Sequence, residues 1–209
     1  MVRKRKIGFK GQLLTLSIIG FSILIYCFPH LSDFFVYSRQ AILNGELWRL
    51  FTAPFVHFST SHIFWDILVF GIAGFSVSIS GFPRFWIVCC LVVFIPGLLF
   101  LLLFPDLEYY GGLSGLATGA VAYYCLCNIF LTERRRQIWL ILLLVMGIKI
   151  CIETILDKSI FVYTDIVNFR ILHLAHIVGY LGAIATIVWT CHKTIFCRIR
   201  KNTNKTVKT

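Results

Sequence analysis

The chain has 209 residues, of which 58% are hydrophobic and 14% are charged, and its mean hydropathy is +0.85. A soluble domain of this size would expose more apolar surface than water tolerates, so the composition excludes one. The net charge of +11 does not indicate nucleic-acid binding, because the basic residues cluster in short segments beside the apolar runs and no aromatic-basic surface accompanies them.

Six apolar runs are long enough to cross a bilayer, which takes about 20 residues of α-helix. They cover residues 12–30, 58–80, 85–104, 112–132, 137–156 and 171–191. We therefore predict an all-α polytopic membrane protein with one six-helix domain over residues 12–191. Basic tails at residues 1–11 and 192–209 flank this domain.

Lys and Arg residues are divided unequally between the two sides of the predicted bundle. Only three lie in the connections 31–57, 105–111 and 157–169, whereas fifteen lie in the segments 1–11, 81–84, 133–136 and 192–209. Because short cytoplasmic segments carry an excess of positive charge, both termini are predicted to be cytoplasmic. The second, fourth and sixth helices then all run inward, with their first turns at one depth near the outer surface.

Segment 31–57 is the longest outer connection, and Trp48 and Arg49 are among its many aromatic and charged residues. This mixture favours an element that lies in the membrane interface. The segment leads into His57, His62 and Asp66 at the start of the second helix. His62 and Asp66 are four residues apart and share one helix face, where they could donate to an oxyanion or bind a metal ion.

Ser114 opens the fourth helix and has glycines on both sides. These glycines permit close backbone approach and expose the hydroxyl, and the first N–H groups of a helix, which lack internal partners, can stabilise an oxyanion. A second interpretation of the segment is helix packing, because Gly115 and Gly119 form a GxxxG pattern.

His173 and His176 open the sixth helix. Ionisable groups are costly inside a bilayer, so each is a functional candidate. Serine is a weak nucleophile until a base accepts its proton, and His176 is the predicted base for Ser114. Small residues after His176 would let the two helices approach each other. No carboxylate has an evident claim to orient the imidazole, so a dyad is the simpler prediction; the alternative is a histidine bonded to a backbone carbonyl.

A membrane metalloenzyme is a competing interpretation of the same polar residues. Histidine and carboxylate ligands suit zinc or iron, and the candidates are His57, His62, Asp66, His173 and His176. This interpretation leaves the serine segment unused, whereas the serine hypothesis requires no metal and no cofactor.

Three segments together resemble the signature regions of the rhomboid family of intramembrane serine proteases, in the same order. They are WRLFTAPFVHFSTSHIFWD at 48–66, GLSGLATG at 112–119 and AHIVGYLG at 175–182. The resemblance covers the predicted core, residues 12–191. It implies a rhomboid-like bundle of six transmembrane helices that hydrolyses peptide bonds near the outer membrane face.

The resemblance also implies a role for each matching position. Ser114 becomes the nucleophile and His176 its base. The implied oxyanion partners are His62, Asp66 and the backbone N–H of Ser114. Four further residues of the same motifs are implied in substrate binding or gating: Trp48, Arg49, His57 and Gly112.

Two positions depart from the family pattern. Asp66 stands where the family usually has asparagine, and an ionised carboxylate cannot donate a hydrogen bond to an oxyanion. Either burial keeps Asp66 protonated, or Asp66 holds His62. Thr118 stands where many rhomboids have a tyrosine that stacks on the base, so another group must position that base, and the candidates are His173 and Tyr180.

Within the family, the chain is most similar to the rhombosortase branch. The similarity lies in the segment YYGGLSG at 109–115 and in the pair Lys149-x-x-x-Glu153 of the fifth helix. That branch is associated with trimming proteins that end in a Gly-Gly motif, a transmembrane segment and a basic tail. The implied partners are transmembrane protein substrates and the lipid bilayer, with no nucleic acid, in a bacterial inner membrane. A catalytically inactive relative that binds membrane clients is the remaining alternative.

Overall fold

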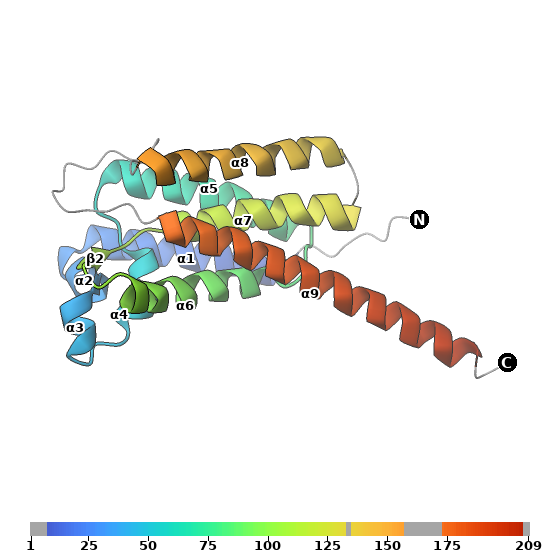
Figure 1. Ribbon diagram of the computed structural model, residues 1–209, viewed down its shortest axis with the longest axis horizontal. Coiled ribbons are helices and arrows are strands. Elements are labelled where there is room, and N and C mark those ends of the chain that lie inside the picture. Colours follow the sequence, from blue (N-terminus) through green and yellow to red (C-terminus); the bar gives the residue numbers. More distant parts are fainter. Residues whose placement is uncertain (1–7, 133–134, 157–172, 207–209) are drawn as a thin grey trace.

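The structure is a computed structural model that describes residues 8–132, 135–156 and 173–206, with the backbone alone from residue 193 onward. Six of its helices are long and apolar enough to cross a membrane, which confirms the predicted six-helix bundle. They lie side by side in Figure 1: α1 (Phe9–Cys27), α5 (Thr60–Ile79), α6 (Phe85–Leu103), α7 (Ser114–Cys127), α8 (Arg136–Leu156) and α9 (His173–Thr206). A π-helical turn, Asn128–Thr132, continues α7.

Among the described residues, the predicted spans agree with the observed membrane spans to within three residues at each boundary, where the sixth span is the part of α9 from His173 to His192. The largest shift is in the first span, which ends at Cys27 because Pro29 opens the separate helix α2 (Pro29–Phe35). Proline is tolerated in the first turn of a helix but not in its interior. The predicted outer segment 157–169 and residues 1–7 of the basic N-terminal tail lie outside the described residues.

The central helix of the bundle is α7. Inside the bundle, 72% of its span is buried, against 17% to 50% for the other five spans. Its sequence allows this burial because small residues let neighbouring helices approach closely. The first turn of α7, which Ser114 begins, is therefore surrounded by protein rather than by lipid.

The connection between α1 and α5, which we predict to be outer and call the outer connection, folds into short elements at the end of the bundle opposite to the start of α1 (Figure 1). These elements are α2, β1 (Tyr37–Ser38), α3 (Arg39–Leu43), α4 (Arg49–Thr52) and the 3₁₀ turn η1 (Ala53–Phe55). β1 pairs antiparallel with β2 (Tyr109–Tyr110), which lies just before Ser114. The connection that was predicted to lie in the interface is thus joined directly to the segment that carries the serine.

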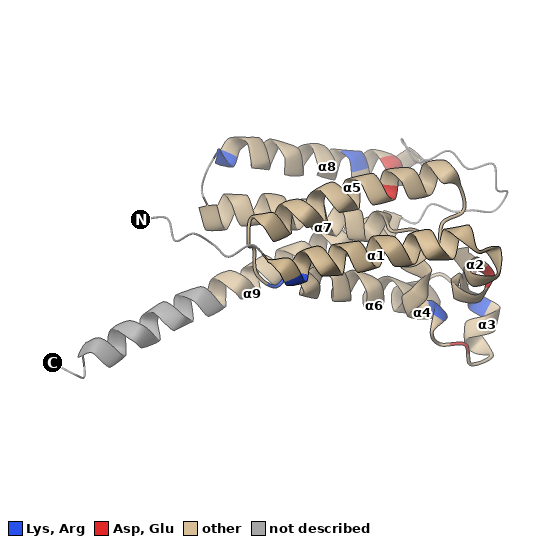
Figure 2. Ribbon diagram, turned by 180° about the vertical axis from the view of Figure 1, so that it is seen from behind, with Lys and Arg blue, Asp and Glu red and all other residues tan. Residues whose placement is uncertain are grey.

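Charged residues gather mainly at the two ends of the bundle, as Figure 2 shows. Among the described spans, three charged residues lie away from the helix ends: Asp66 in α5, and Lys149 and Glu153 in α8. An ionisable group at this depth is costly unless it has a partner. The partners of these three residues define the polar interior of the bundle.

Candidate active site

The loop before Ser114 takes its shape from Gly112. Gly112 has a φ of +133°, a conformation that residues with side chains rarely adopt. Its N–H donates to the carbonyl of Ala53 at 3.3 Å. The hydrogen-bond ladder of α7 then begins with the N–H of Ala117, which donates to the carbonyl of Leu113 at 2.9 Å. The earlier N–H groups of the first turn are left without intrahelical acceptors, as at any helix start.

The helix α9 touches the first turns of α7 where both helices carry small residues. A Cβ atom on Gly115 would lie 2.9 Å from the carbonyl oxygen of Ala175, and one on Gly179 would collide with the carbonyl oxygen of Gly115. Ser114 and His176 are the chain neighbours of Gly115 and Ala175. The helix packing expected from the glycines therefore exists, and it places the serine turn beside the histidine turn.

The side chains of Ser114 and His176 do not form a hydrogen bond to each other in the described part of the chain. His176 is only 5% exposed, and Ser114 is partly buried. Catalytic hydrogen bonds are often long in a resting enzyme and shorten when substrate binds. The Ser114–His176 dyad stays a prediction, supported by the adjacency of the two turns.

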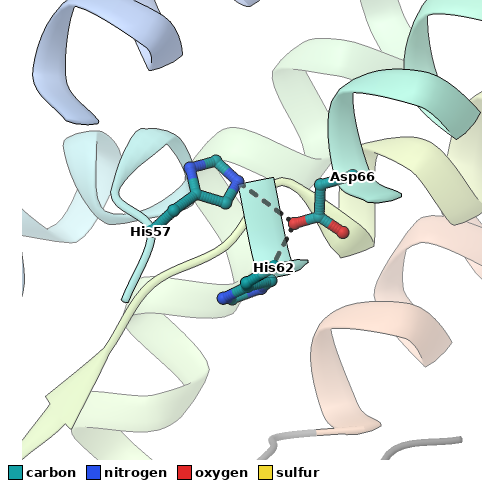
Figure 3. Close-up of side chains that lie close together, drawn as sticks. All are labelled: His57, His62 and Asp66. Atoms are coloured by element: carbon teal, nitrogen blue, oxygen red, sulfur yellow. Dashed lines mark hydrogen bonds and ion pairs between the residues drawn. The ribbon is translucent and has the colours of Figure 1, made fainter. Parts of the chain in front are cut away.

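Three buried residues at the start of α5 form one cluster, drawn in Figure 3. Nε2 of His57 lies 3.2 Å from Oδ2 of Asp66, and Nε2 of His62 lies 3.3 Å from the same oxygen. The predicted pairing of His62 with Asp66 on one helix face is therefore present. Because a carboxylate oxygen only accepts, both imidazoles can donate to it. Asp66 thus holds two histidines at once.

His57 links this cluster to the serine loop. Its Nε2 atom also lies 3.3 Å from the backbone nitrogen of Leu113. One Nε2 atom cannot donate to Asp66 and accept from Leu113 at the same time, and the charged carboxylate is the stronger partner. Burial lowers the pKa of His57 and outweighs the Asp66 carboxylate, which raises it. His57 is therefore a neutral imidazole at pH 7.

Gly112 lies directly against His62. A Cβ atom at position 112 would lie 2.7 Å from Nε2 and 2.8 Å from Cε1 of His62. Any side chain there would push the loop and the imidazole apart. The absence of a side chain at Gly112 therefore keeps His62 next to the loop that ends in the N–H of Ser114.

A second buried cluster lies at the start of α9. Glu153, His173 and His176 place one ligand-type atom each within 4.8 Å of one another. Nδ1 of His176 lies 3.6 Å from Oε2 of Glu153, and the same oxygen accepts from Nζ of Lys149 at 2.7 Å. In the sequence no carboxylate has an evident claim to orient this imidazole, and in the structure the carboxylate that lies beside it is Glu153. The sequence signal for Glu153 was its pairing with Lys149 inside an apolar helix, but a sequence does not show which neighbouring helix such a pair faces.

The ligands of the predicted metal site separate into two groups in the structure. Among the described residues, His57, His62 and Asp66 form one group, and His173 and His176 form the other together with Glu153. Each group offers two imidazoles and one carboxylate, a donor set that suits zinc or iron. In both groups, however, the carboxylate oxygen lies within 3.6 Å of an imidazole or ammonium nitrogen. In the first group, contacts among the three side chains therefore account for these donor atoms.

Two other predicted residues stabilise the outer connection. The indole of Trp48 stacks on Phe34 with ring centroids 5.1 Å apart and donates to the carbonyl of Phe34 at 3.1 Å. The guanidinium of Arg49 donates to the carbonyls of Asp33 and Val36 at 2.6 and 2.9 Å. Both side chains thus fix the shape of the connection. Their role in substrate binding or gating stays a prediction. The same is true of the roles assigned to His57 and Gly112.

Neither residue predicted to replace the missing tyrosine stacks on His176. The ring of His173 is tilted by 58° and its centroid lies 6.1 Å from that of His176. The hydroxyl of Tyr180 reaches the carbonyl of Leu143 on α8 at 3.5 Å. The carboxylate of Glu153, by contrast, lies 3.6 Å from Nδ1 of His176.

Comparison with known proteins agrees with this architecture. The sequence profile of the Rhomboid domain matches residues 44–193, well over half of the chain. A search of curated proteins finds no match. The matched region contains five of the six spans, the serine turn and both buried clusters. The chain therefore belongs to the rhomboid family, a family of intramembrane proteases.

Proposed function

We propose that this chain is an intramembrane serine endopeptidase that cleaves transmembrane segments near the outer membrane face. Ser114 attacks the scissile carbonyl while His176 accepts its proton; the peptide C–N bond then breaks, His176 gives the proton to the leaving amine, and water hydrolyses the acyl-enzyme. The observation that carries the proposal is the contact of Gly115 with Ala175, which brings the two turns together in a protein of a proteolytic family. The reaction needs no cofactor.

The oxyanion of the tetrahedral intermediate would form beside the Gly112 loop. The backbone N–H of Ser114 is one donor, because the first turn of α7 leaves it without an intrahelical acceptor. His62 is the second donor, because its Nε2 edge faces Gly112, and its one Nε2 proton would turn from Oδ2 of Asp66 to the oxyanion as the intermediate forms. Asp66 serves by holding His57 and His62, since an ionised carboxylate would repel the oxyanion.

The substrate helix would reach the site between α5 and α8. The span of α8 is the least buried of the six, with 17% of it inside the bundle. A weakly packed helix can move aside at lower cost than a buried one.

We place the protein in a bacterial inner membrane as a multi-pass protein, with substrates that end in a Gly-Gly motif, a transmembrane segment and a basic tail. The resemblance of residues 109–115 and of the pair Lys149 and Glu153 to the rhombosortase branch supports that substrate class.

A fluorescent fluorophosphonate probe tests the nucleophile without a known substrate. The full chain in detergent is expected to be labelled, and Ser114→Ala and His176→Ala are expected to lose labelling by at least about 100-fold. Ser76→Ala is the matched control, because the hydroxyl of Ser76 bonds to Ile72 on α5 and not to the site. Labelling of Ser114→Ala at the rate of the unmodified chain would overturn the proposal.

The same assay separates the alternatives. A serine enzyme is labelled and still cleaves a reporter substrate in the presence of 1,10-phenanthroline, whereas a metalloenzyme, which acts through metal-bound water, is not labelled and loses cleavage with its ion. A catalytically inactive, client-binding relative would show no labelling above that of Ser114→Ala.

To test the substrate class, a reporter with a Gly-Gly tail is compared with the same reporter carrying Ala-Ala, and equal cleavage of the two would contradict the Gly-Gly assignment.

A further inference from the structure

Glu153 occupies an unexpected position on α8. Most of this helix faces outward, yet three residues along one face are buried: Leu143, Ile150 and Glu153. Glu153 is 0% exposed, less than either of the two apolar residues. A carboxylate is fully buried in a membrane helix only where it is paired and where the pairing has a use.

One oxygen of Glu153 contacts both Lys149 and His176. Oε2 accepts from Nζ of Lys149 at 2.7 Å, and Nδ1 of His176 lies 3.6 Å from the same atom. The ammonium group of Lys149 pairs with the carboxylate and offsets part of the cost of burying it. Nδ1 of His176 is itself buried and has no hydrogen-bond partner among the described residues. An anion therefore faces an imidazole nitrogen that needs an acceptor.

We infer that Glu153 is a positioning residue for His176: it accepts the Nδ1 proton of the imidazole, which directs Nε2 toward Ser114. The inference rests on the proposed protease function. When Ser114 attacks, its proton passes to Nε2, and the new positive charge lies next to the Glu153 carboxylate. The Nδ1 proton stays on the ring, and Glu153 is not protonated in the step. The present 3.6 Å separation exceeds a hydrogen bond, and it shortens when the imidazolium forms.

The other charged groups around His176 do not fit this role. The groups that act on it electrostatically are Lys149 and Glu153 from α8, His173 from its own helix and Asp66 from α5. Lys149 is a cation and cannot accept a proton from Nδ1. Oδ2 of Asp66 lies within 3.3 Å of Nε2 of both His57 and His62. Of the two groups left, Glu153 carries the negative charge and its Oε2 lies 3.6 Å from Nδ1 of His176, whereas the ring centroid of His173 lies 6.1 Å from that of His176.

The test is the pH dependence of fluorophosphonate labelling of the full chain. Glu153→Gln keeps the shape of the side chain but removes the charge. We expect labelling at pH 8 to slow roughly 100-fold, the lower end of the contribution of positioned proton transfer. We also expect the acid midpoint of the labelling rate to fall by about 1 pH unit, because the imidazolium loses its anion. Glu153→Asp, which keeps the charge, should recover part of the rate.

A double variant separates positioning from simple charge pairing. Lys149→Met with Glu153→Met removes both charges, and a well-packed apolar pair often preserves stability. We expect this variant to unfold near the temperature of the unmodified chain and still to label as slowly as Glu153→Gln. Normal labelling of the double variant would show that Glu153 only neutralises Lys149, and a normal rate and midpoint for Glu153→Gln would also overturn the inference. If Ser114→Ala were labelled normally, the proposed function would fail instead.

Discussion

At the scale of single residues, the polar interior consists of two imidazole–carboxylate clusters with different geometries. Oδ2 of Asp66 lies within 3.3 Å of Nε2 of both His57 and His62, which is close to hydrogen-bond distance in the resting structure. Oε2 of Glu153 accepts from Nζ of Lys149 at 2.7 Å but lies 3.6 Å from Nδ1 of His176. The first geometry suits a fixed support for the oxyanion donors. The second suits a contact that strengthens only when charge develops.

Asp66→Asn tests whether the carboxylate itself is required. Asparagine can still accept from one imidazole and can donate in addition, so we expect fluorophosphonate labelling within about tenfold of the unmodified rate. Asp66→Ala leaves His57 and His62 without their acceptor and should label at least about tenfold more slowly than Asp66→Asn. Equal loss in both variants would show that the negative charge of Asp66 has a role of its own.

His57 gives the fold a pH dependence. Its pKa is lowered by burial, so the unfolded chain binds a proton at a higher pH than the folded chain does. The free energy of unfolding therefore falls as the pH drops below about 6.5, the ordinary value for histidine. His57→Asn should be less stable at neutral pH but should lose less stability between pH 7 and pH 5. Thermal unfolding in detergent at several pH values measures this, and parallel losses for the two proteins would contradict the assignment.

Part of the site was predictable at this scale. A spacing of four residues on a helix settles that His62 and Asp66 meet, so their contact could be expected from the sequence alone. The contact between Glu153 and His176 joins two different helices. It depends on the rotation of α8 about its own axis, which a uniformly apolar sequence does not determine. The ionisable pair of α8 was therefore visible in the sequence, but the contact of Glu153 with His176 was not predictable from it.

At the scale of elements, the close contact between α7 and α9 positions the proposed nucleophile and base. It depends on small residues, because the backbone of each helix touches the other at Gly115, Ala175 and Gly179. This packing was predictable from the small residues that follow Ser114 and His176. The short helices of the outer connection were not predicted individually. Their stability comes from tertiary bonds such as those of Arg49 to the carbonyls of Asp33 and Val36, rather than from local periodicity.

Gly179→Ala tests the helix contact. The added Cβ would collide with the carbonyl oxygen of Gly115, so the helices must separate. We expect a loss of about 1–3 kcal/mol in the free energy of unfolding, typical of overpacking, together with slower labelling of Ser114. Gly147→Ala on α8 is the matched control, because a Cβ there would meet nothing within 4 Å. Similar stability and labelling for the two variants would show that α7 and α9 are not in backbone contact.

At the scale of the whole molecule, the distribution of Lys and Arg and the number of spans together predict the orientation in the membrane. An even number of spans places the start of α1 and the end of α9 at one end of the bundle, as Figure 1 shows, and the outer connection at the other. The excess of Lys and Arg outside the apolar runs predicts which end is cytoplasmic. With that orientation, the first turns of α5, α7 and α9 lie toward the outer face, where water can reach an acyl-enzyme.

Reporter fusions in a bacterial host test the orientation. Green fluorescent protein fused after residue 209 should fluoresce, and alkaline phosphatase fused at the same position should be inactive, because the C-terminus is predicted to be cytoplasmic. Alkaline phosphatase fused after Asn44, in the outer connection, should be active. The reverse pattern would place the proposed site on the cytoplasmic side and would contradict cleavage near the outer face.

The most direct test of the central claim is a crystal structure of the full chain after reaction with a fluorophosphonate. We predict a covalent bond from phosphorus to Oγ of Ser114, with Nε2 of His176 within hydrogen-bond distance of Oγ or of the alkoxy oxygen of the adduct. The phosphonyl oxygen should face the backbone N–H of Ser114 and the imidazole of His62. Phosphorus on any other residue, or His176 turned away from the adduct, would contradict the account.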